Sequence, residues 1–267
     1  MTDSGSAAFT DHFASVAGQY ARFRPGYPPA LFEFLAAHSP GHDLAWDCGT
    51  GTGIAAIALA ETFRAVVATD ASAAQLAQAP PHARITYRVQ REGQSGIADG
   101  AASLVTVAQA AHWFDLDAFY REVDRVLRPG GLVALWCYGI LGIDDRIDAV
   151  LHRFEHERVG PYWPAERRHI DADYRTLPFP YPRIEAPAFV MEATLTRAAL
   201  LGYLGSWSAV SRYRAATGVD PIPEVEAALS PLWPDGKARS VHWPLTVVAG
   251  RMPGRPHAGG QSGILRE

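Results

Sequence analysis

Cysteine, lysine and long apolar runs are all scarce in this sequence. Among 267 residues only Cys48 and Cys137 are cysteines, and Lys237 is the only lysine. Both cysteines fall in apolar segments that we predict to be strands of one core, which indicates reduced thiols rather than a disulfide framework. No apolar run reaches the roughly 18 residues of a membrane span, and the first residues lack the basic and apolar regions of a signal peptide. We therefore expect a cytoplasmic protein that is not held in a membrane.

A surplus of positive charge is missing as well. The net charge is −4, and the basic residues are scattered along the chain instead of forming a stripe. Nucleic acid is therefore not expected as a partner. A composition of 48% hydrophobic and 19% charged residues is typical of a globular protein. We expect a small-molecule substrate, and the sequence leaves open whether the protein is a monomer or a dimer.

Strand-like apolar runs alternate with helical patterns between residues 44 and 138. The candidate strands are "LAWDC", "AVVATD", "RITYRV", "SLVTVAQ" and "GLVALWCY". This alternation predicts parallel strands joined by helices, and hence an α/β sheet. The clearest helix lies in "FDLDAFYREVDRVLRPGG", where Asp115 can cap the start and Pro129 with the two following glycines is predicted to end it.

The alternation stops after residue 139. A stretch rich in proline, aromatic residues, arginine and histidine follows, and we interpret it as an insertion after the fifth strand. Beyond it come "AFVMEATLT" and "SVHWPLTVVAG", which predict two more strands with helices between them. The predicted divisions are a helical arm at 1–40 that covers a ligand, an α/β domain at 41–250 with a lid insertion at 140–187, and a loosely held tail at 251–267.

A glycine-rich turn, "DCGTGTG", connects the first predicted strand to an alanine-rich helix. Glycine lets the backbone turn sharply and lets a ligand approach the main chain. The dinucleotide fingerprint G-x-G-x-x-G would need its third glycine where Ile54 stands. Asp47 would also place negative charge beside a pyrophosphate. Both features argue against NAD and favour a ligand with an amino group and a sulfonium, such as S-adenosylmethionine.

Seven motifs occur in an order that resembles one known family. They are "YARFRPGYP", "DCGTGTG", "ATDAS", "VTVAQAAHWFD", "EVDRVLRPGGLVALWCYG", "YLGSWSAVSRYR" and "WPLTV". The chain is similar over nearly its whole length to class I S-adenosylmethionine-dependent methyltransferases with a type 11 methyltransferase domain, in particular those similar to trans-aconitate methyltransferase. The resemblance implies a Rossmann-like, doubly wound, seven-stranded sheet with an antiparallel last strand. It also implies S-adenosylmethionine as cofactor and S-adenosylhomocysteine as product.

The resemblance assigns cofactor contacts to the glycine turn and to the end of the second strand. Asp70 stands where Rossmann-like folds place an acid that accepts hydrogen bonds from ribose hydroxyls; capping of the next helix is the alternative. Asp47 is expected near the methionine end of the cofactor, or as an acid that stabilises the turn. The full set comprises Asp47, Gly49, Thr50, Gly51, Gly53, Asp70 and Ala71.

Three further cofactor contacts follow from the same resemblance. Glu92 is the candidate for the adenine, although it is offset by one residue from the family's usual acid, and main chain could hold the adenine instead. Tyr20 and Arg24 in the arm are expected to close over the cofactor carboxylate or an acidic acceptor, since arginine grips a carboxylate with two parallel hydrogen bonds. The alternative for this pair is a surface contact that anchors the first helix.

The acceptor side is expected just past the fourth strand, in "AQAAHWFD". Gln109 is predicted to contact the cofactor, while His112 and Trp113 are predicted to bind substrate, with packing as the alternative. His112 is also the candidate general base for a hydroxyl or carbon acid. A carboxylate acceptor, which the resemblance suggests, would need no base. Further along the chain, Tyr162, Trp163 and Trp207 are predicted to complete the substrate wall.

One motif points to different chemistry. "HRFEH", from His152 to His156, matches H-x-x-E-H, in which two imidazoles one helical turn apart bind zinc. No third ligand follows at an evident spacing, and five-residue patterns arise easily by chance. We therefore expect no metal site here, and interpret the motif as the solvated face of a lid helix.

Two other functions stay open at this level. A protein that binds the cofactor without turnover, and acts through a partner, is compatible with an acceptor side that has no unambiguous catalytic residue. A nicotinamide-dependent oxidoreductase is disfavoured by Ile54 and Asp47. Methyl transfer from S-adenosylmethionine to a small molecule, with a carboxylate as candidate acceptor, is the function that the sequence favours.

Overall fold

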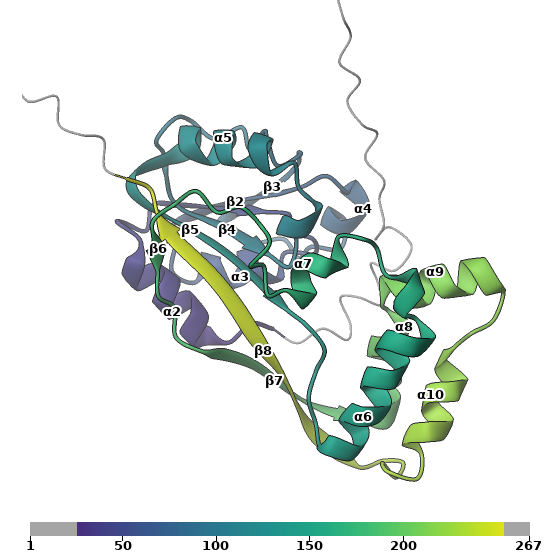
Figure 1. Cartoon of the computed structure of the whole chain (residues 1–267). Coiled ribbons are helices and arrows are strands. Elements are labelled where there is room, and N and C mark those ends of the chain that lie inside the picture. Colours follow the sequence, from purple (N-terminus) through teal and green to yellow (C-terminus); the bar gives the residue numbers. More distant parts are fainter. Residues whose placement is uncertain (1–25, 254–267) are drawn as a thin grey trace, which may run out of the picture.

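A computed structural model gives the fold and describes residues 26–253. Its strands form one twisted sheet (Figure 1) in the order β3-β2-β1-β4-β5-β8-β6, with β7 paired to β8. The strands are β1 (Leu44–Cys48), β2 (Ala65–Asp70), β3 (Ile85–Val89), β4 (Ala102–Ala108), β5 (Leu127–Tyr138), β6 (Arg183–Ile184), β7 (Phe189–Thr196) and β8 (Ala238–Arg251). All seven predicted strands are present, and the two-residue β6 is an addition that the sequence did not predict.

The strand order reverses between β1 and β4. The chain passes from β1 to β2 and β3 on one side, and then returns to place β4 in parallel on the other side of β1. Strand β8 runs antiparallel to β5, as predicted, and β7 runs antiparallel to β8. Open α/β sheets bind ligands at the carboxyl ends of the strands where the order reverses. The glycine turn directly follows β1, so it lies at this point.

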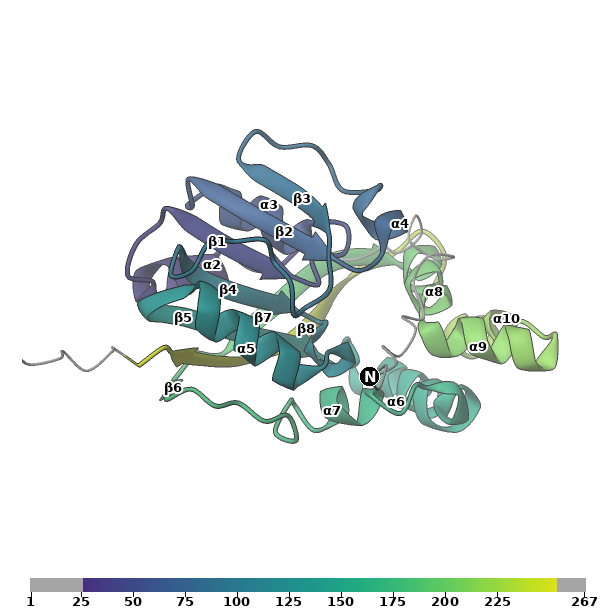
Figure 2. The ribbon, with the colours of Figure 1, turned by 90° about the horizontal axis from the view of Figure 1, so that it is seen from above.

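Helices cover both faces of the sheet (Figures 1 and 2). Helices α2 (Pro29–His38) and α3 (Ile54–Ala60) pack on one face, and α5 (Leu116–Val126) packs on the other. The short α4 (Ala73–Leu76) follows β2. Helix α5 is strongly amphipathic, and its apolar side, including Phe119 and Val123, is buried against the sheet. The doubly wound sheet that the family resemblance implied is therefore confirmed.

Helix α5 begins as predicted but ends earlier. The Asp115 side chain caps it by accepting a hydrogen bond from the backbone N–H of Ala118. The helix ends at Val126, so Pro129 is not its terminator. Leu127 is already extended and pairs with Ala102 of β4. Pairing with the sheet therefore ends the helix before the proline is reached.

A helical lobe lies beyond the carboxyl ends of the parallel strands (Figure 2). It combines the predicted insertion with the helices that precede β8, and we call it the lid. Its insertion elements are α6 (Asp145–Arg153), the π-helical turn η2 (Phe154–Arg158), η3 (Gly160–Tyr162) and α7 (Arg167–Asp171). The later ones are α8 (Arg197–Gly205), α9 (Ser208–Thr217) and α10 (Ile222–Leu229).

Two predicted segments fall partly outside the described residues. Of the N-terminal arm, α2 is described, and it contacts α3 and β5. Residues 1–25 of the arm, with Tyr20 and Arg24, lie outside, as do residues 254–267 of the tail. The predicted contacts of these parts stay predictions.

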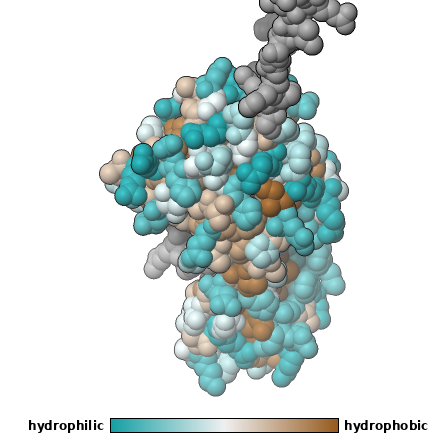
Figure 3. All heavy atoms as spheres, turned by 90° about the vertical axis from the view of Figure 1, so that its left-hand side faces the viewer, coloured by the Kyte–Doolittle hydropathy of each residue, from teal (hydrophilic) through white to brown (hydrophobic). Residues whose placement is uncertain are grey.

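The two cysteines are free thiols in the core, as the sequence predicted. Cys48 and Cys137 are unpaired and buried, and burial raises the pKa of both thiols, so neither suits a nucleophile. Among residues 26–253 no helix has the length and apolar character to cross a membrane. On the face shown in Figure 3, hydrophobic side chains form small groups between hydrophilic ones. This face therefore offers no broad apolar patch.

Candidate active site

The glycine turn after β1 requires glycine at both of its ends. Gly49 has a φ of +69°, and a Cβ there would lie 2.7 Å from Cβ of Ala110. Gly53 has a φ of +83°, and a Cβ there would lie 2.7 Å from the hydroxyl of Tyr87. Side chains are therefore excluded by backbone conformation and by space. At Gly51 a Cβ would meet only Oε1 of Gln75, at 3.8 Å. The middle of the turn is thus the part that a ligand can approach.

Asp70 lies beside this turn at the end of β2. One carboxylate oxygen accepts the backbone N–H of Gly51 and the other accepts that of Ser72, both at 2.8 Å. The cap of α4 is Ser72, whose hydroxyl accepts from the backbone N–H of Gln75. Asp70 is therefore not the helix cap, and that alternative is wrong. With Ala71 directly after it, its carboxylate stands at the turn, in the position that suits a ribose contact.

Asp47 is buried beneath the turn. Its two carboxylate oxygens accept hydrogen bonds from the hydroxyl of Thr50, at 2.5 Å, and from that of Thr106, at 2.8 Å. Burial raises the pKa of Asp47 to about 6. The hydrogen bonds from these hydroxyls and from the backbone of Ala56 lower that pKa, but less than burial raises it. These hydrogen bonds join Asp47 to the turn and to β4, as expected of an acid that stabilises the turn. A second role near the methionine end of the cofactor stays a prediction.

Glu92 ties the loop after β3 to the start of α5. Its Oε1 accepts the backbone N–H of Asp115 at 3.0 Å. Gly93, at the family's usual position for the acid, lies against α5, where a Cβ would be 3.1 Å from Cβ of Ala118. The loop therefore packs closely on the helix. The predicted contact of Glu92 with adenine remains untested.

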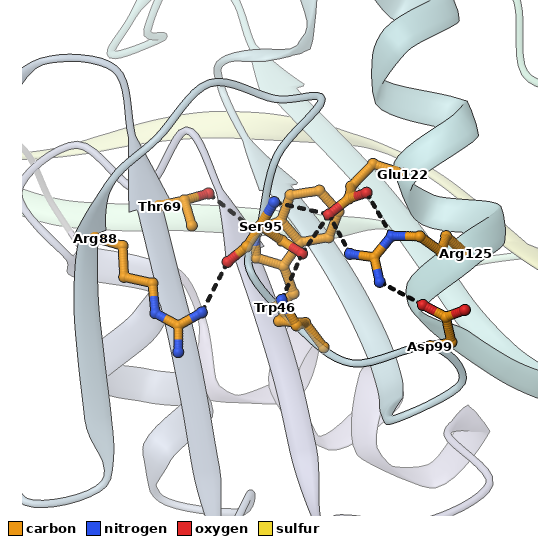
Figure 4. Close-up of polar contacts among 8 residues, drawn as sticks. Trp46, Thr69, Arg88, Ser95, Asp99, Glu122 and Arg125 are labelled. Atoms are coloured by element: carbon orange, nitrogen blue, oxygen red, sulfur yellow. Dashed lines mark hydrogen bonds and ion pairs between the residues drawn. The ribbon is translucent and has the colours of Figure 1, made fainter.

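A buried carboxylate holds the rest of this loop (Figure 4). Oε1 of Glu122 accepts both the backbone N–H and the hydroxyl of Ser95, at 2.7 and 2.6 Å. Arg125 also donates to Glu122 and pairs with Asp99, while Arg88 donates to the Ser95 carbonyl oxygen. Burial tends to raise the pKa of Glu122, but the hydrogen bonds from Arg125 and Ser95 outweigh it and hold that pKa below its usual value. The carboxylate is therefore charged and fixes the loop.

Replacing Glu122 with Gln is expected to destabilise the protein by about 2 kcal/mol, since charge-assisted hydrogen bonds are lost and the Arg125 guanidinium loses a partner. The pKa of the Glu122 carboxyl is lower in the fold than in the unfolded chain. Its contribution to the unfolding free energy is therefore present above the unfolded pKa, and it is lost as the pH falls through the folded pKa. Urea unfolding of Glu122→Gln against Glu33→Gln, an exposed glutamate on α2, measures the effect. Equal unfolding free energies for the two variants would contradict it.

A pocket opens between the sheet and the lid, which we call the lid pocket. It encloses about 660 Å³ when its open mouth is included. Five Trp and Tyr side chains lie in its wall, together with two opposite charges. The lining includes Gln109, His112, Trp113, Tyr138, Glu155, Trp163, Arg167, Tyr203, Ser206 and Trp207.

Gln109 closes the inner end of this pocket. It has a φ of +55°, unusual for a residue other than glycine. Its side-chain amide donates to the carbonyl oxygen of Tyr138 at 3.0 Å and accepts the Tyr138 N–H at 2.8 Å. These bonds fasten the end of β4 to the end of β5. Gln109 thus lines the pocket with a fixed side chain, and its predicted contact with the cofactor stays a prediction.

His112 lies at the pocket wall, 9% exposed, in the 3-10 turn η1 (Ala111–Trp113). Its Nδ1 is 3.0 Å from the hydroxyl of Tyr174, a fully buried residue from the insertion. Burial raises the pKa of Tyr174 well above its ordinary value, so the phenol keeps its proton. This hydrogen bond fixes the orientation of the imidazole ring.

The two charges of the pocket are paired with each other. Nη2 of Arg167 donates to Oε1 of Glu155 at 2.7 Å, and Nε of Arg167 donates to Asp171 at 2.8 Å. The guanidinium lies over the ring of Trp163, 4.4 Å from its centroid. Burial raises the pKa of Glu155, which Arg167 partly offsets. The lid therefore presents a balanced ion pair rather than an unpaired cation.

The structure brings together most of the predicted acceptor residues. His112, Trp113, Trp163 and Trp207 all line the lid pocket. Tyr162 does not, because its ring packs edge-on against Tyr213, 5.0 Å between centroids. The prediction missed several lining residues, although the place of Tyr138 at the end of β5 was a usable signal for one of them. Among those missed are Tyr138, Glu155, Tyr203 and Ser206.

The cofactor side has an unsatisfied acceptor that fits a ligand with hydroxyl or amino groups. Oε1 of Gln75 is buried and has no hydrogen-bond partner among residues 26–253. It lies beside Gly51, close to the carboxylate of Asp70. A buried acceptor of this kind costs free energy unless a donor reaches it.

The fold and the site together define a class of protein. An open parallel sheet with a glycine turn where the strand order reverses, and an acid at the end of the next strand, is typical of α/β proteins that bind a nucleotide cofactor.

Comparisons with known proteins narrow this class. The family model described as a methyltransferase domain matches residues 46–135. A Dictyostelium discoideum protein named as a methyltransferase is 32% identical over 248 residues, which are 90% of this chain and 94% of that protein. A solved structure from Anaeromyxobacter dehalogenans, described as a type II methyltransferase, is 43% identical and aligns with a TM-score of 0.82. It covers 87% of this chain and 100% of its own.

A Saccharomyces cerevisiae protein named as an S-adenosylmethionine-dependent methyltransferase is 30% identical over 128 residues, 45% of this chain and 44% of its own. The chain therefore belongs to the class I S-adenosylmethionine-dependent methyltransferases, and S-adenosylmethionine is its cofactor. The sequence prediction of the family is confirmed. The narrower likeness to trans-aconitate methyltransferases stays a prediction.

Proposed function

We propose that this methyltransferase acts on a small, uncharged molecule that binds in the lid pocket. The observation that carries the proposal is the position and lining of that pocket. It begins at the carboxyl ends of β4 and β5, and five Trp and Tyr side chains lie in its wall. Ala110, next to the lining residue Gln109, lies against Gly49 of the glycine turn. A planar or apolar acceptor would bury its surface against these rings.

The charges of the pocket support an uncharged acceptor. A carboxylate would need a cation that is not already paired, and Arg167 faces both Glu155 and Asp171. Arg24, which the resemblance offers for a carboxylate, lies outside the described residues. The carboxylate acceptor therefore stays a prediction from the sequence, and the test below includes it.

When bound, S-adenosylmethionine supplies a methyl group that is already activated for transfer. The residues that would hold it are those of the glycine turn, with Asp70 at their side. The protein then has to orient the acceptor and exclude water, which the lid does by covering the pocket. For a hydroxyl acceptor His112 would take the proton. This role requires that Nδ1 donates to the Tyr174 hydroxyl and leaves the other ring nitrogen to accept.

Product formation from labelled S-adenosylmethionine over a panel of phenols, neutral heterocycles and carboxylic acids tests the proposal. We expect turnover with neutral aromatic hydroxyl compounds. Turnover confined to carboxylic acids would contradict the uncharged acceptor. Tight binding of S-adenosylhomocysteine with no product from any acceptor would instead favour a binding protein that acts through a partner.

Replacing His112 with Ala is expected to lower kcat by about 100-fold at saturating acceptor, the usual size of a general-base contribution. Tyr174→Phe should lower it by about 10-fold and shift the pH profile of kcat, since the ring loses the hydrogen bond that orients it. His82→Ala, which alters a histidine whose Nδ1 accepts the backbone N–H of Arg84 outside the pocket, is the control. Unchanged kcat in His112→Ala would remove this residue from the base role.

A further inference from the structure

Three potential metal ligands converge in the lid, two exposed histidines and a buried glutamate. His152 in the last turn of α6, and Glu155 and His156 in the following π-helical turn, place their ligand atoms within 4.8 Å of one another. We propose that these residues bind one divalent transition-metal ion, with zinc as the preferred ion. The proposal does not depend on methyl transfer.

The local geometry comes from the helix. Residues three and four apart share one helical face, so His152 lies on the same face as Glu155 and as His156. Glu155 and His156 are adjacent in the chain, and they approach each other in the π-helical turn. The two imidazole rings are parallel, with 5.9 Å between centroids and 4° between planes. Nε2 of His156 is 3.6 Å from Oε2 of Glu155. Ligand atoms around zinc lie about 3.4 Å apart for bonds of about 2.0–2.1 Å. Both imidazoles are exposed, so side-chain rotation can close the remaining distance.

Glu155 is the fixed member of the set. Its side chain is buried, and its other oxygen is held by Arg167, which Asp171 and the ring of Trp163 hold in turn. Hydrogen-bonded carboxylates of this kind orient metal ligands and lower the entropy lost on binding. The chemistry of two imidazoles and one carboxylate, with a position left for water, is that of a zinc site.

The sequence predicted no metal site here because no third ligand follows the motif at an evident spacing. In the fold the third ligand is the motif's own glutamate. The same carboxylate also borders the lid pocket through Arg167. An ion bound here would therefore restrain one wall of the pocket and weaken the negative charge that now balances Arg167.

Calorimetric titration of tag-free, full-length protein with zinc chloride, after chelator treatment and dialysis, tests the proposal. We expect one ion per chain with an affinity in the micromolar range. His152→Ala and His156→Ala should each weaken binding by at least tenfold, and Glu155→Gln should do the same. His169→Ala, which removes another lid histidine that bonds to Thr176, should bind zinc as the parent protein does.

Cobalt(II) provides an independent readout, since a bound ion at a site of this kind gives a visible absorption band that His156→Ala should remove. Binding of S-adenosylhomocysteine by each variant shows whether the fold is retained, so that a misfolded variant is recognised. Absence of saturable zinc binding by the parent protein would overturn the proposal. Equal zinc affinity in the His152→Ala/His156→Ala double variant would also overturn it, because the ion would then lie elsewhere.

Discussion

Replacing Asp70 with Ala is expected to weaken the binding of S-adenosylhomocysteine by about 100-fold. The carboxylate stands at the carboxyl end of β2 beside the glycine turn. Two hydrogen bonds from ribose hydroxyls to a charged acceptor are together worth about 3 kcal/mol, and each 1.4 kcal/mol is tenfold in affinity. Isothermal titration calorimetry of the two proteins measures the difference directly.

Asp70 also accepts the N–H groups of Gly51 and Ser72, so its removal loosens the turn itself. Asp70→Asn keeps the shape and one acceptor oxygen, and we expect it to lose about tenfold. Asp43→Ala, at the amino end of β1 and far from the turn in the strand direction, serves as control. Full affinity in Asp70→Ala would show that the ribose is held elsewhere. Heat from NAD in a parallel titration would reopen the oxidoreductase alternative.

The unfolding free energy of this protein should decrease as the pH rises from about 4 to about 6, because of Asp47. Burial raises the pKa of this carboxyl from 3.8 to about 6 in the fold. As the pH rises, the carboxyl therefore ionises in the unfolded chain before it ionises in the fold. The protonated carboxyl favours the fold below the unfolded pKa, and this contribution to the unfolding free energy is lost as the pH rises through the folded pKa. A difference of about two pKa units corresponds to about 3 kcal/mol.

Asp47→Asn removes this ionisation, so the variant should match the parent protein near pH 4 and exceed its unfolding free energy by up to about 3 kcal/mol above pH 6. Urea unfolding of both proteins across this range checks it. Asp43→Asn changes an exposed carboxylate just before the same strand and should show no such pH dependence. A stability difference that is constant with pH would contradict the prediction.

The same substitution tests the second role of Asp47. If the carboxylate also faces the cationic end of the cofactor, Asp47→Asn should bind S-adenosylmethionine less tightly despite its higher stability. Such a protein would gain stability and lose function at one position, which is common where a binding site holds an unfavourable charge.

The glycine turn and its neighbours were predictable because their reasons are local. Gly49 and Gly53 need a left-handed backbone, and the strand before them and the helix after them have their own hydrophobic periodicities. The end of α5 was not predictable in the same way. Pairing of Leu127 with β4 decides it, and the partner strand lies a loop and a helix earlier in the chain.

The acceptor side shows the same limit more strongly. Trp163 and Trp207 were predicted as wall residues because they are aromatic and follow the fifth strand in the chain. Tyr162, directly before Trp163, has the same features but packs on Tyr213 instead. Glu155 belongs to the pocket only because Arg167, twelve residues later, turns back to meet it. Likewise the contact of His112 with Tyr174 joins two segments that no periodicity relates.

The sequence by itself determined the family, the parallel sheet with its antiparallel last strand, the glycine turn and the acid at the end of β2. The parallel sheet and the glycine turn follow from hydrophobic spacing and backbone conformation over a few residues. The family and the antiparallel last strand followed from the resemblance of the motifs. Only the tertiary structure decided which lid side chains line the pocket, that its charges are balanced, and that His152, Glu155 and His156 converge. Contacts between distant segments depend on how the lid packs over the sheet, and no single stretch of the sequence determines that packing.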